Sequence, residues 1–226
     1  PEKDLLVSQL GTIKILEHAI LQGGIRRLVY AGSGCAIYGA QAPLPLKEEF
    51  ISMHLSTPYQ ISKMAGELYC NFYWHHYNLP IVKTRFFNSY GPGEVPGQYR
   101  NVIPNFIYWA MKGQPLPITG DGSMTRDFTY VDDIVDGLVK CYTSMFVSRH
   151  STTHLIDNFK EFELGRGKNY SINEIADAFG EGYPRKYVDE WRGEMRETLC
   201  TDTKAREQLD WKPTKDVIEY IKETNG

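Results

Sequence analysis

Helical and strand patterns alternate over the first 90 residues, and this alternation restricts the fold more than any other feature. Apolar residues recur at three- and four-residue spacing over residues 3–22, and Gly23-Gly24 end that helix. Residues 27–31 are expected to form a short buried strand and residues 81–86 the next strand, with a helix over residues 57–77 between them. Because parallel sheets are built from strands joined by crossover helices, this order predicts an α/β fold.

The helix over residues 57–77 has a clear start signal. Thr57 stands at the cap position, Pro58 at the first helical position, and Gln60 three residues after the cap. After residue 88 the pattern changes, and residues 147–160 have no periodicity that assigns them to an element. The other elements expected there are a loop over 89–100, a strand over 116–119, a capping box at 171–174, and helices over 102–113, 131–145, 202–209 and 214–224.

Composition excludes several classes of protein. The chain has 226 residues, 42% hydrophobic and 23% charged, with a net charge of −3 and no basic run, so no nucleic-acid partner is expected. No apolar stretch approaches the roughly 20 residues of a membrane span. The four cysteines are scattered, which predicts reduced thiols and a cytoplasmic protein. His150 and His154 have ligand-like spacing but no nearby carboxylate or cysteine to join them, so no metal site is expected.

Tyr59 and Lys63 are candidates for chemistry. Their spacing of four places both side chains on one face in the first turns of a helix. A lysine ammonium beside a phenol favours the phenolate, so Lys63 is expected to lower the pKa of Tyr59 and make it a usable base. Such pairs also arise by chance, and Tyr108 with Lys112 is a second one. The alternative for either tyrosine is packing, which suits Tyr108 because Trp109 stands beside it.

Several further segments carry a resemblance to a known family. They are Val29–Ser33 with Tyr38-Gly39, Pro58–Lys63 (P-Y-x-x-S-K), Arg85–Pro92 (R-x-x-N-x-Y-G-P), Thr125–Asp133 (R-D-F-x-x-V-D-D), Arg192–Glu194, Asp202–Ala205 and Leu209–Trp211. These blocks occur in the order and at about the spacing found in NAD-dependent nucleotide-sugar epimerases and dehydratases, a group of extended short-chain dehydrogenases. The sequence resembles that family along nearly its whole length.

The resemblance implies a fold and a reaction. The fold is a partial Rossmann-type parallel sheet with flanking helices over residues 1–88, plus a smaller mixed α/β lobe over 89–226 that holds the sugar nucleotide, with later segments free to return to the sheet. In the family, NAD takes a hydride from the sugar, usually at C4, and the resulting ketone is rotated and reduced, or loses water or carbon dioxide. NADP is less expected than NAD.

The resemblance also implies site residues. Tyr59 is the base, and Lys63 holds the nicotinamide ribose and tunes Tyr59. Ser33 and Cys35 are the other implied catalytic residues. The implied cofactor-binding residues are Tyr59, Lys63, Ala31 and Phe86. The implied residues for the nucleotide-sugar substrate are Asn88, Asn101, Arg126 and Arg192. Two alternatives remain open: a salt bridge from Arg126 to Asp127 or Asp132, and a purely turn-forming Asn88.

The sequence departs from the family pattern at important positions. Roughly the first 80 to 90 residues of that pattern, which contain the G-x-x-G-x-x-G loop for the cofactor pyrophosphate, have no counterpart here. The family's catalytic Ser/Thr falls on Gly34, flanked by Ser33 and Cys35. The acidic pair of dehydratases falls on Cys35-Ala36, and the distal phosphate-binding arginine falls on Trp191, one place before Arg192.

Three functional hypotheses therefore stand at this point. The first is a nucleotide-sugar epimerase, because the acid and base needed for dehydration are replaced by Cys35-Ala36. The second is an inactive relic that binds a nucleotide sugar or serves a structural role. The third is a dehydratase. In the family, two helices from each subunit pair in a dimer, and these correspond to residues 3–22 and 57–77, so a homodimer is expected.

Overall fold

The computed structural model describes residues 1–39, 52–97, 100–144, 160–190 and 194–225. Arg192 and nearly all of the unassigned segment 147–160 lie outside these ranges. Within them, no helix has both the length and the apolar character that crossing a membrane requires.

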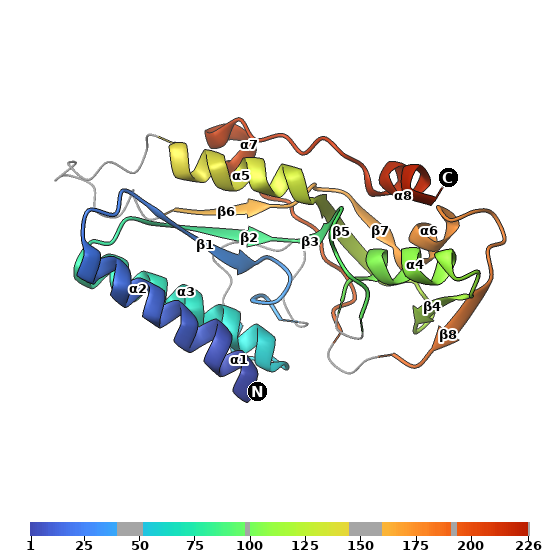
Figure 1. Cartoon of the computed structure of the whole chain (residues 1–226), viewed down its shortest axis with the longest axis horizontal. Coiled ribbons are helices and arrows are strands. Elements are labelled where there is room, and N and C mark those ends of the chain that lie inside the picture. The colour runs from blue at the N-terminus through green and yellow to red at the C-terminus, as the bar shows by residue number, and fades with distance from the viewer. Residues whose placement is uncertain (40–51, 98–99, 145–159, 191–193, 226) are drawn as a thin grey trace.

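The first lobe is built on a three-stranded parallel sheet (Figure 1). In sheet order its strands are β1 (Leu28–Ser33), β2 (Ile81–Phe86) and β6 (Lys160–Leu164). One face is covered by α1 (Glu2–Asp4), the π-helical segment η1 (Leu5–Leu10), α2 (Gly11–Gln22) and α3 (Pro58–Tyr77). Helices α5 (Val131–Thr143) and α7 (Lys204–Leu209) cover the other face. The predicted α/β class is therefore confirmed.

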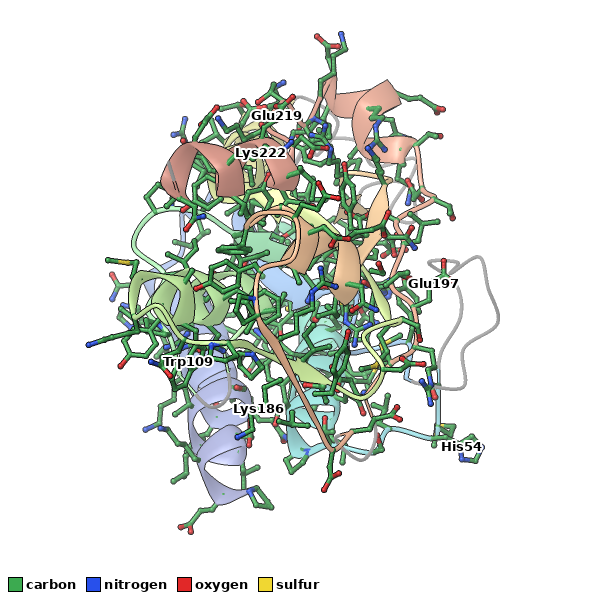
Figure 2. All side chains as sticks on the ribbon, turned by 90° about the vertical axis from the view of Figure 1, so that its right-hand side faces the viewer. His54, Trp109, Lys186, Glu197, Glu219 and Lys222 are labelled. Carbon is green, nitrogen blue, oxygen red and sulfur yellow. The ribbon has the colours of Figure 1, made fainter. Side chains whose placement is uncertain are left out.

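The second lobe is mixed α/β and has its own core. Its strands are β3 (Asn88–Tyr90), β4 (Leu116–Thr119), β5 (Thr125–Tyr130), β7 (Asn169–Ser171) and β8 (Arg185–Val188). Its helices are α4 (Val102–Met111), α6 (Ile172–Asp177) and α8 (Val217–Asn225). In the end-on view of Figure 2, α8 with Glu219 and Lys222 lies at the top of this lobe and α4 with Trp109 at its side. Buried Phe106, Phe128 and Ile175 join these elements.

Local capping signals match the structure closely. The backbone N–H of Gln60 donates to Thr57 Oγ1 at 3.2 Å, and Gln60 Oε1 accepts from the Thr57 N–H at 3.1 Å, so α3 begins where the capping box places it. Ser171 and Glu174 form the same reciprocal pair at the start of α6. Each pair satisfies backbone donors that the first helical turn leaves open.

The sequence did not reveal the strands that depend on distant partners. The predicted loop over 89–100 overlaps β3, which pairs in parallel with the end of β5. β5 also pairs antiparallel with β7, and neither had been predicted. β4 has the bounds predicted for the strand over 116–119, but its parallel partner β8 had not been predicted. These strands are three to six residues long, too short for a clear period-two pattern. Three elements from residues after 88 return to the first lobe. Strand β6 is part of its sheet, and helices α5 and α7 pack against that sheet.

Candidate functional site

A cavity of about 390 Å³ opens at the carboxyl ends of β1 and β2. Residues from β1, the start of α3, the end of β2 and β5 form its wall together with Met195 and Thr198. The carboxyl ends of parallel strands are where open α/β sheets bind their ligands. The predicted site residues that line it are Ala31, Ser33, Cys35, Tyr59, Lys63, Phe86, Asn88, Asn101 and Arg126. One cavity thus collects every predicted site residue that the structure describes.

Tyr59 lies in the first turn of α3 and contacts the end of β1. A hydrogen bond from Ser33 favours its ionised form, but desolvation around the hydroxyl outweighs that bond and raises the pKa of Tyr59 above its ordinary value, although the residue as a whole is 47% exposed. Lys63 Nζ lies 5.8 Å from the centre of the Tyr59 ring and donates to the Ala31 carbonyl at 3.1 Å. The expected net lowering of the Tyr59 pKa is therefore wrong: its pKa lies above the ordinary value even with Lys63 close by.

Lys63 is held between two aromatic rings. Its Nζ lies 5.9 Å from the centre of the Tyr30 ring as well as 5.8 Å from that of Tyr59. Burial lowers the pKa of Lys63, since a charged ammonium is costly to desolvate. An ammonium has three donors, and the Ala31 carbonyl uses one of them. The geometry suits a lysine that also binds hydroxyl groups in the cavity.

Gly34 leaves no room for a side chain. A Cβ atom at this position would lie 2.5 Å from the ring of Phe87. The neighbouring Ser33 supplies a hydroxyl instead: it is 8% exposed, accepts from the Ala36 N–H at 3.1 Å and bonds to Tyr59. The other neighbour, Cys35, donates to Asn88 Oδ1 at 3.4 Å, and burial raises its pKa to about 12. Cys35 therefore stays a thiol, which is a weak donor.

Substitution of Gly34 by alanine is expected to lower the free energy of unfolding by about 1–3 kcal/mol, because the added methyl group overlaps the Phe87 ring. Urea unfolding measures the change. Gly97→Ala is the matched control, since the added Cβ would lie 3.4 Å from Arg100 Cγ, an ordinary van der Waals distance. Equal stability of the two variants would show that Phe87 moves aside freely.

Asn88 is held by groups from three segments. Its Oδ1 accepts from Cys35 Sγ and, at 3.2 Å, from Thr198 Oγ1, while its Nδ2 contacts Asn101 Oδ1 at 3.5 Å. Asn101 Nδ2 donates to the Ser89 carbonyl at 3.0 Å. Asn88 therefore does more than form the turn before Tyr90: it fixes an amide in the cavity wall. Thr198 carried no sequence signal, because its partner is 110 residues away in the chain.

Arg126 presents a guanidinium to the cavity from β5. It pairs with Glu194 at 3.0 Å and donates to the Thr125 carbonyl at 2.9 Å. The predicted alternative of a bridge to Asp127 or Asp132 is not what the structure shows. Asp127 instead accepts backbone N–H groups of Arg166, Gly167 and Cys200, because consecutive strand residues point to opposite sides. Arg126 has five N–H donors and uses only some of them on these partners.

Comparison with known proteins places this geometry in a family. The sequence model of the NAD dependent epimerase/dehydratase family matches residues 1–153. This chain belongs to the NAD-dependent epimerase/dehydratase family. A UDP-glucose 4-epimerase of Mycolicibacterium smegmatis is 31% identical over 228 residues, which cover 99% of this chain and 69% of that relative. That relative is named as an enzyme, and the family is one of enzymes.

Solved structures of similar proteins agree with the fold. An epimerase from Methanothermobacter thermautotrophicus superposes with a TM-score of 0.88 at 43% identity, over 100% of this chain and 65% of its own. The UDP-glucose 4-epimerase of Thermotoga maritima, solved with UDP-glucose, gives a TM-score of 0.86 at 28% identity, over 100% of this chain and 70% of its own. The family member described here spans about two thirds of the length of these relatives.

Proposed function

We propose that this chain forms the substrate-binding and proton-transfer part of an enzyme that epimerises a nucleotide sugar at C4 through a transient ketone. One observation carries the proposal: Tyr59, Lys63 and Arg126 line one cavity at the carboxyl ends of the sheet strands. Ser33 lines the same cavity and forms a hydrogen bond with Tyr59. The names of similar proteins support the same reaction class.

Proton transfer falls to Tyr59 and its neighbours. Tyr59 accepts the proton of the sugar hydroxyl, and Ser33 donates a hydrogen bond that stabilises the phenolate. The Lys63 ammonium, 5.8 Å from the centre of the same ring, favours the phenolate over the neutral phenol. Because burial raises the pKa of Tyr59, the rate is expected to increase with pH as the phenolate forms.

The wall of the cavity fits the nicotinamide end of NAD. Ala31 and Phe86 lie at the carboxyl ends of β1 and β2, and Lys63 offers donors for ribose hydroxyls. NAD, when bound, supplies the acceptor and donor of hydride. The sequence of residues 1–226 contains no G-x-x-G-x-x-G turn between a strand and a helix, so these residues account for only part of a dinucleotide site.

The other side of the cavity suits a diphosphate. Arg126 has a planar guanidinium that can hold two phosphate oxygens, and Asn88 and Asn101 add amide groups next to it. Arg192, which lies outside the described residues, remains a candidate for the second cationic contact. A UDP-hexose is the substrate class to try first, because the Thermotoga maritima relative was solved with UDP-glucose.

The dehydratase alternative has less support. Elimination of water needs an acid and a base at the sugar, and none of the described residues lining the cavity is an aspartate or a glutamate. Ala36 and Cys35 stand where dehydratases have their acidic pair. The inactive-relic alternative is tested by cofactor content: purified protein with NAD bound, shown by mass spectrometry, supports the enzyme, and protein free of NAD that gains none from solution favours the relic.

We also propose a homodimer through η1, α2 and α3, which lie side by side on the first lobe (Figure 1). Many large apolar side chains of these elements are exposed. They are Leu5, Leu6, Val7, Leu10, Ile15, Leu21, Ile61, Leu68, Tyr69, Phe72 and Tyr77. An apolar surface of this extent on paired helices is typical of a protein–protein interface.

Leu68→Glu is expected to weaken self-association at least tenfold, because it places a charge in this helix pair. Light scattering at micromolar concentrations measures it. Val139→Glu is the matched control: Val139 on α5 is 53% exposed, much like Leu68 at 52%, but faces away from α2 and α3. A wild-type protein that runs as a clean monomer would contradict the dimer.

A further inference from the structure

A group of charged side chains is buried between α3 and the first sheet. Arg85 on β2 donates two hydrogen bonds to Glu67 on α3, from Nε to Oε1 at 3.1 Å and from Nη2 to Oε2 at 2.9 Å. Arg85 is 6% exposed and Glu67 3%. A bidentate pair of this kind fixes both position and orientation of the two elements that carry it.

The third nitrogen of Arg85 extends the connection. Arg85 Nη1 donates to the Tyr38 hydroxyl at 2.8 Å, and that hydroxyl donates to Glu163 Oε1 on β6. Tyr38 and Glu163 are 0% and 1% exposed. The Arg85–Tyr38–Glu163 bridge therefore joins two strands to the turn that follows β1. Glu67 links the same bridge to α3.

Each partner in this bridge is close in sequence to a site residue. Tyr38 stands three residues after Cys35 in the turn that begins at Ser33, and Glu67 stands one helical turn after Lys63. The Arg85–Tyr38–Glu163 bridge thus fixes the turn against the helix that carries Tyr59. None of its members lines the cavity, so they act on the site only through the residues they position.

Glu163 is the member of the bridge whose charge can change near neutral pH. Burial raises its pKa to about 7, opposed by Tyr38 and Arg85. Among the described residues its Oε2 atom is buried with no N–H or O–H donor, and the Cys200 thiol is the neighbouring weak donor that lowers the pKa. The titratable groups around Glu163 are Tyr38 and Cys35 from the turn, Arg85 from β2, and Cys200 and Asp202 from the segment before α7.

We infer that Glu163 is a positioning residue whose loss or gain of a proton alters the Arg85–Tyr38–Glu163 bridge and so shifts the Ser33–Cys35 turn relative to Tyr59. An ionised Glu163 accepts a charge-assisted hydrogen bond from Tyr38, which is shorter and stronger than the bond to a neutral carboxylic acid. The Ser33–Cys35 turn is held firmly when Glu163 is ionised and more loosely when Glu163 is protonated. The catalytic meaning of this switch rests on the function proposed above, but the switch itself does not.

The stability of the protein should follow the same proton with a defined sign. A carboxyl group whose pKa is raised on folding binds more protons in the folded state than in the unfolded state. The contribution of Glu163 to stability is therefore fully present below its unfolded pKa, which is about 4.5, and is lost as pH rises through about 7. The pKa of Asp127 is also raised, to about 6, so Asp127 contributes a loss of stability of the same sign. The difference in stability between the wild type and Glu163→Gln, measured across pH, therefore isolates the contribution of Glu163.

Carbon-13 NMR of the full chain, labelled at glutamate carboxyl and tyrosine Cζ atoms, tests the inference without requiring turnover. The Tyr59→Phe variant identifies the Tyr59 signal. We expect one carboxyl signal to titrate near pH 7 in the wild type and to vanish in Glu163→Gln. The Tyr59 signal should shift with the same midpoint in the wild type and lose that step in Glu163→Gln and in Tyr38→Phe. Glu161→Gln, two residues along the same strand, removes an ion pair to Lys83 but none of the hydrogen bonds of the Arg85–Tyr38–Glu163 bridge, and should keep the step.

Two results would overturn the inference: a Tyr59 signal with no step near pH 7 in the wild type, or the same step in Glu163→Gln. Tyr38→Phe keeps the ring and the packing, so it decides the question if Glu163→Gln does not fold. If the protein converts a UDP-hexose, the inflection near pH 7 in kcat should also disappear in Glu163→Gln with KM unchanged. Absence of conversion in the wild type would count against the proposed function and leave the NMR result standing.

Discussion

Replacement of Tyr59 by phenylalanine is expected to reduce turnover of a nucleotide sugar by about 10²-fold or more while binding of the sugar nucleotide stays nearly intact. The phenol hydroxyl is the group that carries the proton, and its contribution as a general base is of this size. The diphosphate is held elsewhere in the cavity, at Arg126 and Asn88, so affinity should change little. Steady-state kinetics and calorimetry on the same protein separate the two effects.

Two further variants sharpen this test. Tyr108→Phe is the matched control, because Tyr108 forms the other Tyr-x-x-x-Lys pair, is 40% exposed on α4 and does not line the cavity. Lys63→Met should also lower activity, and should move the remaining rate to higher pH. A Tyr59→Phe protein with activity within threefold of the wild type would rule out the role of Tyr59 as the base.

Arg126→Ala is expected to weaken binding of a UDP-hexose by about 2 kcal/mol, or roughly 30-fold, because it removes a charge-assisted contact to the diphosphate. The variant leaves Glu194 without its cation, but that side chain is 32% exposed, so water can solvate the carboxylate. Calorimetric titration with UDP-glucose and with UDP measures the loss, which should be similar for both ligands.

The matched control for this substitution is Arg196→Ala. Arg196 lies on the same segment as Glu194 and pairs with Glu190, but its side chain is 68% exposed and does not reach the cavity. Its loss should leave affinity unchanged. Unchanged affinity in Arg126→Ala as well would mean that Arg126 serves the fold through Glu194 and the Thr125 carbonyl alone.

The features that the sequence predicted well are those specified by nearby residues. The start of α3 follows from Thr57, Pro58 and Gln60, and the face shared by Tyr59 and Lys63 follows from helical spacing. The motif resemblance then grouped site residues from β1, α3, β2 and β5, and the structure brings them to one cavity. Their catalytic and binding roles remain predictions.

Features that depend on distant contacts escaped the sequence. Phe87 over Gly34 and Glu194 beside Arg126 join positions far apart in the chain, and no local pattern marks either contact. The sign of the Tyr59 pKa shift was wrong because desolvation of the phenol hydroxyl, which a sequence does not display, outweighs the hydrogen bond from Ser33 that lowers the pKa. The buried bridge from Arg85 to Glu163 could not be predicted either, because strands β2 and β6 are far apart in the sequence and meet only in the folded sheet.

Conversion of UDP-galactose, followed by proton NMR in the presence of NAD, tests the central proposal most directly when applied to the protein that carries this chain. We expect UDP-glucose to appear until an equilibrium mixture of the two C4 epimers is reached, with no such change in the Tyr59→Phe variant. A 4-keto-6-deoxy product would identify a dehydratase instead. UDP-galactose that binds and stays unconverted, with NAD bound as well, would contradict the account and leave a nucleotide-sugar-binding protein without epimerase activity.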